Sequence, residues 1–459
     1  MYKRQAYEID IREAFTGRSV WNSGKVYSSQ SQLVSTKGAD IRPDNSFNYS
    51  WRVRVWDETD TPSEWSNEAK FRAVPERLSS GQWIGAITRQ NAHLPEGRKF
   101  HGGELKKPEV KAAWEAVDTL AKKSICLRRT FQVGDAKEGG ANRKPGKKIV
   151  EATAYVCGLG FYEFSLNGKK VGNSEFAPLW SDYDKTVYYN TYDVTEQLRR
   201  GENVVGILLG NGFYNVQGGR YRKLQISFGP PTLLFELVIN YEDGTCTTVH
   251  SDNNWKYDFS PVTFNCIYGG EDYDARREQK GWNQIGFDDS HWRPVVIQEA
   301  PKGILRPQMA APVKIMERYD IQKVTKLNAD QVASASVSTK RTVDLSAFVL
   351  DMGQNLAGFP EITVRGKRGQ KVTLIVAEAL TEEGACNQRQ TGRQHYYEYT
   401  LKGEGDETWH PRFSYYGFRY IQVEGAVLKG QKNPQKLPVL KNIQSCFCLL
   451  YTSPSPRDA

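Results

Sequence analysis

With 459 residues, the chain is long enough for three or four domains, each with its own hydrophobic core. Its net charge of +9 comes from 62 basic and 53 acidic residues, and much of the excess lies in two stretches, 143–148 and 429–441. Neither stretch interleaves stacking aromatics with its basic residues, so we expect solvated loops and no nucleic-acid partner. No apolar run is long enough to predict a membrane span.

The spacing of cysteine and histidine argues against a metal centre. The seven Cys residues form no CxxC pair, and the six His residues show no HExxH pattern. We therefore expect buried free thiols, no disulfide framework and no transition-metal site. Short apolar runs punctuated by Gly, Pro, Tyr and Thr predict an all-β fold, with β-sandwich domains in series and one inserted helix.

The first predicted domain covers residues 6–74. Its apolar residues alternate with polar ones, most clearly in the run SWRVRVWD at 50–57. This segment resembles a fibronectin type III sandwich. Residues 75–125 follow as a linker that contains the helix: between Glu109 and Lys122 apolar residues recur at helical spacing, and Pro108 stands at the start.

The next predicted domain, residues 126–324, has jelly-roll-like β patterning. The pair Asn167-Gly168 predicts a tight hairpin, and residues 204–209 form an unbroken aliphatic run, as expected of a strand buried on both faces. Residues 242–244 predict a second hairpin, whose Asp-Gly pair supplies the positive φ angles. Residues 135–148 predict a polar loop.

A further β-domain is predicted over residues 325–426, and residues 427–447 are expected to form a linker. Both ends of the chain resemble translated sequencing adaptor: MYKRQ at 1–5 and the tail 448–459, which begins CLLYTSPSPRD. We therefore expect the natural gene to extend on both sides. The compartment stays open, with a periplasmic or extracellular location favoured.

Several motifs, in the same order, resemble the N-terminal β-domains of bacterial α-L-rhamnosidases of glycoside hydrolase family 78. They are LNGKKVG, FAPLWSDYDKTVYYNTYDVT, LGNGFYN, YGGEDYDARRE, GWN and DMGQN, the last with Met where the family has Phe. The resemblance covers most of residues 7–447 and implies an enzyme that removes terminal α-L-rhamnose with inversion. It also implies that both catalytic carboxylates lie in an (α/α)₆ barrel downstream, so no catalytic residue is expected here.

The densest acidic cluster lies within residues 268–276. A glycosidase needs two carboxylates that face each other across the scissile bond. Glu271 and Asp274 are three residues apart, and on an extended segment such residues point to opposite faces. We therefore expect a local structural role, in which Asp274 pairs with Arg276 and fixes the loop.

Carbohydrate binding is the function that the loops of the 126–324 domain favour. Sugars pack their C–H faces on aromatic rings and offer hydroxyls to Asp, Asn and Arg. The candidate substrate-binding residues are Asn173, Trp180, Asp182, Asp184, Asn211, Tyr214, Glu271, Asp274 and Arg276. Relatives that resemble family 67 carbohydrate-binding modules hold L-rhamnose through calcium. Here Asn173 stands at the acidic position, so no metal ligand is assigned and Ca²⁺ is treated as optional, with no required cofactor.

Three interpretations remain open from the residues. The first is the N-terminal part of an α-L-rhamnosidase, inactive alone, whose partners are rhamnose-containing glycans. The second is a free-standing carbohydrate-binding or adhesion protein. In the third interpretation, the β-domains serve only as structural support for a catalytic barrel, which predicts exposed apolar patches on their surface.

Overall fold

The computed structural model describes residues 6–14, 16–32, 34–41, 48–73, 78, 81–95, 99–134, 148–221, 224–334, 347–392 and 394–450. Contacts divide the chain into two compact units, Met1–Ser79 and Ser80–Ala459. The predicted loop at 135–147 and the terminal segments 1–5 and 451–459 lie outside the described residues.

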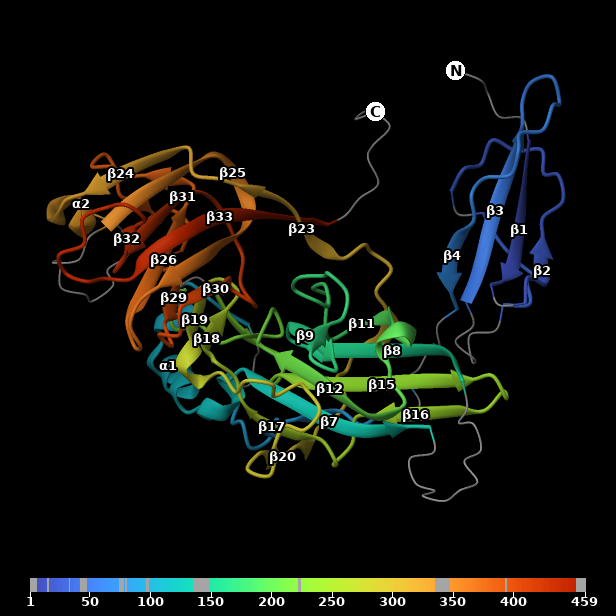
Figure 1. The fold of residues 1–459 in the computed structure, drawn as a ribbon, viewed down its shortest axis with the longest axis horizontal. Helices are drawn as coiled ribbons and strands as arrows, with labels where there is room; N and C mark the ends of the chain where they lie inside the picture. Colours follow the sequence, from blue (N-terminus) through green and yellow to red (C-terminus); the bar gives the residue numbers. More distant parts are fainter. Residues whose placement is uncertain are drawn as a thin grey trace. The chain divides into compact units, whose positions relative to one another are not determined.

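The first unit is a four-stranded antiparallel sheet in the order β2-β1-β3-β4 (Figure 1). Its strands are β1 Ala6–Glu13, β2 Ser19–Asn22, β3 Asn48–Trp56 and β4 Ala69–Arg72. The alternating pattern places Ile11 and Tyr49 in a small core on one face. The described strands of this unit belong to one sheet.

The second unit begins with a sandwich of two sheets. One sheet has the order β21-β5-β15-β8-β11-β22, with β16 beside β15, and the other has the order β10-β9-β12-β7-β17-β20. The first contains β21 Val296–Ile297, β5 Ile84–Gly85, β15 Thr232–Tyr241, β8 Ile149–Leu159, β11 Thr186–Asp193, β22 Ile304–Pro307 and β16 Cys246–His250. The second contains β10 Lys169–Lys170, β9 Tyr162–Leu166, β12 Gly201–Leu209, β7 Ile125–Val133, β17 Lys256–Phe259 and β20 Arg293–Pro294.

The sandwich core lies between these two sheets. β12 is central in its sheet, and on one face Val204 is buried and Leu208 half-buried, so the predicted burial on both faces is met except at Leu208. On the other face Val205, Ile207 and Leu209 are completely buried. They pack in one cluster with side chains of the opposing sheet such as Phe235. A three-stranded sheet, β13-β14-β6, lies beside the sandwich and consists of β13 Asn215–Val216, β14 Leu224–Ser227 and β6 Lys99–His101.

The two predicted hairpins are present. Asn167 and Gly168, with φ of 52° and 83°, join β9 to β10, so the turn has the two positive φ angles that an Asn-Gly pair favours. At the second hairpin, between β15 and β16, Gly244 has a φ of 78°, but Asp243 is not among the residues with positive φ. The expectation that both members of the Asp-Gly pair supply positive φ angles is therefore wrong at Asp243.

The C-terminal half of the second unit is an eleven-stranded sheet whose main path is β18-β19-β29-β26-β31-β25-β33-β23 (Figure 1). Its strands are β18 Val262–Cys266, β19 Gly270–Asp274, β23 Val313–Tyr319, β24 Lys323–Leu327, β25 Ala347–Arg365, β26 Lys371–Ala377, β29 Tyr396–Thr400, β30 Asp406–Trp409, β31 Tyr416–Glu424, β32 Val427–Leu428 and β33 Val439–Leu450. A short pair, β27 Ala379–Leu380 and β28 Cys386–Asn387, completes the strands. We call this part the C-terminal lobe.

Strand pairing in this lobe differs from the sequence expectation in two places. β18, β19 and β23, which fall inside the predicted 126–324 domain, belong to the sheet of the C-terminal lobe. The expected linker at 427–447 contains β32 and most of β33. β33 pairs with both β25 and β23, and even Cys448 and Leu449, at the start of the expected tail, pair with β23. Long-range pairing of this kind leaves little trace in local sequence.

The expected helix is shorter than its apolar pattern. α1 runs over Pro108–Glu115, with proline in its first turn as predicted, and a 3₁₀ turn follows at Thr119–Lys122. The Asp118 side chain accepts a hydrogen bond from the N–H of Leu120 at 2.7 Å and so forms the N-cap of this separate 3₁₀ turn. A second helix, α2 Ala329–Ser334, was not predicted. Further 3₁₀ turns lie at Glu104–Lys106, Thr195–Gln197 and Ala275–Arg277.

All seven cysteines are free thiols. Six are buried, as expected, and Cys246 is exposed. Neither helix among the described residues has the length and apolarity to cross a membrane.

Candidate functional site

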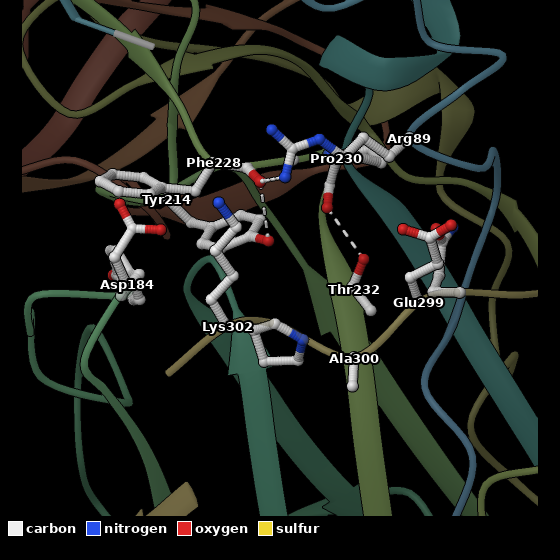
Figure 2. A pocket seen from close by; sticks show the side chains of 13 residues that line it. Arg89, Asp184, Tyr214, Phe228, Pro230, Thr232, Glu299, Ala300 and Lys302 are labelled. Atoms are coloured by element: carbon white, nitrogen blue, oxygen red, sulfur yellow. Dashed lines mark hydrogen bonds between the residues drawn. The ribbon is translucent and has the colours of Figure 1, made fainter. Parts of the chain in front are cut away.

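A pocket of about 100 Å³ opens at one end of the sandwich, beside the start of β15. Its walls come from five separate segments: Arg89, the pair Tyr183-Asp184 before β11, Tyr214, and the two stretches 228–232 and 298–302 (Figure 2). These segments are distant in sequence, so the pocket exists only in the folded chain.

Three aromatic rings form one wall of the pocket. The ring centroids of Tyr183 and Tyr214 are 5.1 Å apart in an edge-on arrangement, and those of Tyr214 and Phe228 are 5.9 Å apart and stacked. The Tyr214 hydroxyl donates a hydrogen bond of 3.1 Å to the Phe228 carbonyl oxygen. A Cβ at Gly229 would come within 2.8 Å of that hydroxyl, so glycine permits the close approach. Burial raises the pKa of Tyr183, which is therefore a neutral phenol.

Charged side chains of both signs surround the aromatic wall. Figure 2 shows Asp184 on one side of the pocket and Glu299 on the other, with Lys302 reaching from the chain below. Arg89 donates a hydrogen bond of 3.1 Å from Nη1 to the Phe228 carbonyl, so this carbonyl holds both Arg89 and Tyr214. All four charged residues are exposed at the mouth. Tyr183 and Tyr214 are themselves buried, and Phe228 is half-buried, so Phe228 has more ring surface open to a ligand. An aromatic ring bordered by such donors and acceptors fits a small polyhydroxyl ligand.

Two of the residues predicted from the sequence, Asp184 and Tyr214, line this pocket. Trp180 lies elsewhere: it is 65% exposed and borders a mainly apolar pocket of about 380 Å³ together with Phe213, 5.7 Å away between ring centroids. Asn173 and Asp182 are exposed and line neither pocket. Asp182 instead pairs with Lys185 at 3.0 Å.

Asn211 has a structural position. It is completely buried, and its side chain donates to the backbone carbonyls of Lys122 at 3.0 Å and Asn265 at 3.2 Å. Its own N–H donates to the side chain of Asn265 at 2.7 Å. These bonds join the loop after β12 to β18, so no polar group of Asn211 faces either pocket.

The acidic cluster is structural too. Glu271 is completely buried, and burial raises its pKa to about 8, although N–H donors on Arg412 and Phe413 act against that shift. Asp274 forms a double hydrogen bond with the guanidinium of Arg276, at 2.8 Å for each bond. This is the local clamp that the sequence predicts.

Sequence reasoning missed Arg89, Phe228, Glu299 and Lys302, which complete the pocket of Figure 2. Each stands in a segment with no motif around it. Only the pairing of β5 with both β15 and β21 brings residue 89 and the 298–302 segment to one place. Among the described residues, no group of three or more His, Cys, Asp or Glu is arranged to hold a metal ion.

Comparison with known families and proteins shows which families and proteins this chain is similar to. Three families match: the alpha-L-rhamnosidase N-terminal domain at residues 147–317, the bacterial alpha-L-rhamnosidase concanavalin-like domain at 341–444, and the Rha78A-like N-terminal immunoglobulin domain at 2–74. An alpha-L-rhamnosidase of Formosa agariphila is 34% identical over 93% of this chain and 43% of its own length. One from Alteromonas sp. is 30% identical over 98% of this chain and 44% of its own length.

The fold agrees with these matches. The structure of alpha-L-rhamnosidase from Dictyoglumus thermophilum aligns with a TM-score of 0.74 and 28% identity, covering 98% of this chain and 45% of the other. The chain thus spans less than half the length of these three relatives, at their N-terminal β-domains. The observed immunoglobulin-like, sandwich and concanavalin-like parts, in this order, show that the chain belongs to the α-L-rhamnosidase family as its N-terminal β-domain portion.

Proposed function

We propose that the whole protein containing these β-domains hydrolyses terminal α-L-rhamnose from glycans, with inversion of configuration. The support is the family membership of the chain and the names of its relatives, which are alpha-L-rhamnosidases. The two carboxylates that this reaction needs would lie in the part that the relatives have beyond these domains. Within the described residues, Glu271 and Asp274 are both engaged in structural contacts. The present chain is therefore expected to be inactive.

An assay on an aryl α-L-rhamnoside tests this proposal. The purified chain should release no aryl alcohol above the uncatalysed background, whereas a longer chain that continues into the missing part should do so. Turnover by the present chain would contradict the proposal and direct attention back to Glu271. The Glu271→Gln variant would then identify the source of the activity.

For these domains themselves, we propose carbohydrate binding at the pocket of Figure 2. The observation that carries the proposal is the meeting of an aromatic wall with Asp184 and Lys302 at one exposed mouth. Aromatic rings accept the C–H face of a pyranose, and charged groups exchange hydrogen bonds with its hydroxyls. The volume of about 100 Å³ limits the ligand to one sugar unit at the end of a glycan. Rhamnose is the sugar that the family membership favours.

Calcium is not required in this proposal. Asp184 and Glu299 lie on opposite sides of the pocket, and among the described residues no group of three or more Asp, Glu, His or Cys is arranged to hold a metal ion. Calcium sites gather six to eight oxygen ligands. Addition of a chelator should therefore leave the affinity for L-rhamnose unchanged.

Calorimetric titration of the chain with L-rhamnose, with and without calcium, tests the binding site. Asp184→Ala and Lys302→Ala should each weaken binding about tenfold, the change that about 1.4 kcal/mol produces. Lys185→Ala is a matched control, because Lys185 follows Asp184 directly but lines no pocket among those described. Equal affinity of all three variants and the wild type would contradict the assignment of this pocket.

A further inference from the structure

A third cavity, of about 410 Å³, lies between the sandwich and the C-terminal lobe. It shares no lining residue with the pocket of Figure 2. Its walls come from β9 and β10 of the sandwich, from Tyr273 in β19, from the segment 278–283 and from Arg412. The volume falls in the range of about 300–1,000 Å³ that is usual for small-molecule sites. We call it the junction cavity.

Most of the charges around the junction cavity are paired with one another. Glu163 Oε1 lies 3.2 Å from Arg412 Nη1, and Glu278 Oε2 lies 2.6 Å from Lys402 Nζ. Lys170 Nζ lies 2.8 Å from a carboxylate oxygen of Glu175 just outside the lining. Lys280, which also lines the cavity, has no ion-pair partner among the described residues, so the wall combines three ion pairs with one unpaired positive charge. Because most of the charge is paired within the protein, the cavity favours a ligand that is rich in hydroxyl groups.

Hydrogen-bonding capacity remains on these side chains. Among the described residues, Glu163 Oε2 accepts no hydrogen bond, whereas Oε1 accepts one from Arg412. Burial would raise the pKa of Glu163, but the charges of Arg412 and Lys170 outweigh it and hold that pKa below its ordinary value. Glu163 is therefore an ionised acceptor at neutral pH. A carboxylate with an unoccupied oxygen suits the hydroxyls of a sugar.

Asn283 supplies a second acceptor. Its Nδ2 donates a hydrogen bond of 3.0 Å to Ser165 Oγ, which in turn donates to the carbonyl of Gly206 at 2.9 Å. These bonds fix the orientation of the amide. Within the described part of the chain its oxygen has no donor, so the amide presents an acceptor from a fixed position.

Trp282 provides an aromatic surface at the same cavity. Its ring stacks on that of Trp292, with 6.1 Å between the centroids, and it packs against β12 so closely that a Cβ at Gly206 would lie 3.0 Å from Trp282 Cζ3. The indole is therefore held in place from two sides while it lines the cavity. A fixed indole loses little conformational entropy when a ligand stacks on it.

We propose that the junction cavity is a second carbohydrate site, which binds one neutral pyranose unit with its C–H face on Trp282 and its hydroxyls on Glu163 and Asn283. This site is independent of the pocket of Figure 2, and it depends on the packing of the sandwich against the C-terminal lobe. An aromatic side chain with fixed hydrogen-bond acceptors beside it is the combination that sugars need.

The test is calorimetric titration of the whole chain with L-rhamnose, D-galactose and D-glucose, with D-galacturonate as the charged comparison. The wild type should bind at least one neutral sugar at a site that Trp282→Ala and Asn283→Ala each weaken about tenfold or more, which corresponds to about 1.4 kcal/mol. Trp282→Phe keeps an aromatic face and should retain most of the affinity. Gln284→Ala is the control, because Gln284 is the next residue and is not part of the cavity wall.

Variants of the two pockets separate the two proposals. Asp184→Ala and Lys302→Ala should leave the junction site unchanged, and the Trp282 and Asn283 variants should leave the pocket of Figure 2 unchanged. Circular dichroism melting of each variant shows that it is folded at the titration temperature. The proposal is overturned if no neutral sugar binds, if D-galacturonate binds more tightly than all three neutral sugars, or if Trp282→Ala and Asn283→Ala bind as the wild type does.

Discussion

Glu271 and Phe413, 142 residues apart in the sequence, are joined by a hydrogen bond of 2.8 Å from the Phe413 backbone N–H to Glu271 Oε2. The N–H of Arg412 approaches both oxygens of the same carboxyl group, at 2.9 and 3.1 Å. Glu271 lies in β19, and the two donors lie in the loop that leads to β31. A single buried carboxyl group therefore fixes this loop, which also carries Arg412 into the junction cavity.

Loss of this carboxyl group should destabilise the second unit. Glu271→Ala leaves two buried backbone N–H groups without an acceptor, at a cost of about 1–3 kcal/mol for each. Glu271→Gln keeps one acceptor oxygen and should cost less. Urea unfolding of the variants would measure the difference. A stability of Glu271→Ala equal to that of the wild type would contradict the structural role.

The same residue should make stability depend on pH. Burial raises the pKa of Glu271 to about 8 in the folded chain, from an ordinary value of 4.5. The folded state therefore holds its proton more tightly than the unfolded state does, and the Glu271 contribution to the free energy of unfolding falls as the pH rises from 4.5 to 8. Unfolding at several pH values should show a shallower decline for Glu271→Gln than for the wild type. Parallel curves would contradict the shift.

His395 should act in the opposite direction. It is buried, with Nε2 2.9 Å from the Tyr397 hydroxyl, and burial lowers its pKa to about 3 from 6.5. The unfolded chain gains this proton below pH 6.5, whereas the folded chain does not, so stability is lost as the pH falls from 6.5 toward 3. The loss should be smaller in His395→Gln, whose side chain does not titrate. An equal loss in both proteins, measured by urea unfolding at pH 7 and pH 5, would contradict this expectation.

Gly210, at the end of β12, marks a close contact between the sandwich and the C-terminal lobe. A Cβ at this position would lie 2.4 Å from Cδ2 of Phe413, whose ring is buried and cannot move aside without repacking. Gly210→Ala should therefore lower stability by about 1–3 kcal/mol, as overpacked sites typically do. Gly103→Ala is the control, because that glycine has a φ of −65° and no neighbouring atom within 4 Å. Comparable melting of the two variants would show that the contact is loose.

Asn211 allows a separation of structural from binding roles. Asn211→Ala removes the side-chain hydrogen bonds to the carbonyls of Lys122 and Asn265. We expect a loss of about 1–3 kcal/mol of stability, because buried groups lose their partners. Affinity for L-rhamnose should stay unchanged below the melting temperature, since Asn211 lines neither carbohydrate pocket proposed above. A large loss of affinity in a folded Asn211→Ala chain would return this residue to the binding site.

The sequence by itself determined the class of fold, the family and the local turns. Asn167-Gly168 predicts a tight turn because of its backbone geometry alone, and that turn is present. The aliphatic run at 204–209 predicts a buried strand because its side chains are apolar one after another, and that strand is present. The pairing of Asp274 with Arg276 is equally local. Arg276 lies in a 3₁₀ turn that Asp274 caps, and not on an extended segment, but the two side chains still reach each other without help from the rest of the chain.

Tertiary structure alone decided which residues share a site. Asp184 and Tyr214 lie in one pocket with Arg89, Glu299 and Lys302. The strand β5 brings these distant segments together because it pairs with both β15 and β21. Glu271 in β19 and Asn211 in the loop after β12 are polar residues of the kind that bind ligands, yet both are buried where the two lobes pack. The composition of a segment shows only which polar groups it contains. Burial and hydrogen bonding across long sequence separations decide which of those groups face a pocket, because a polar atom that already has a partner inside the protein has little capacity left for a ligand.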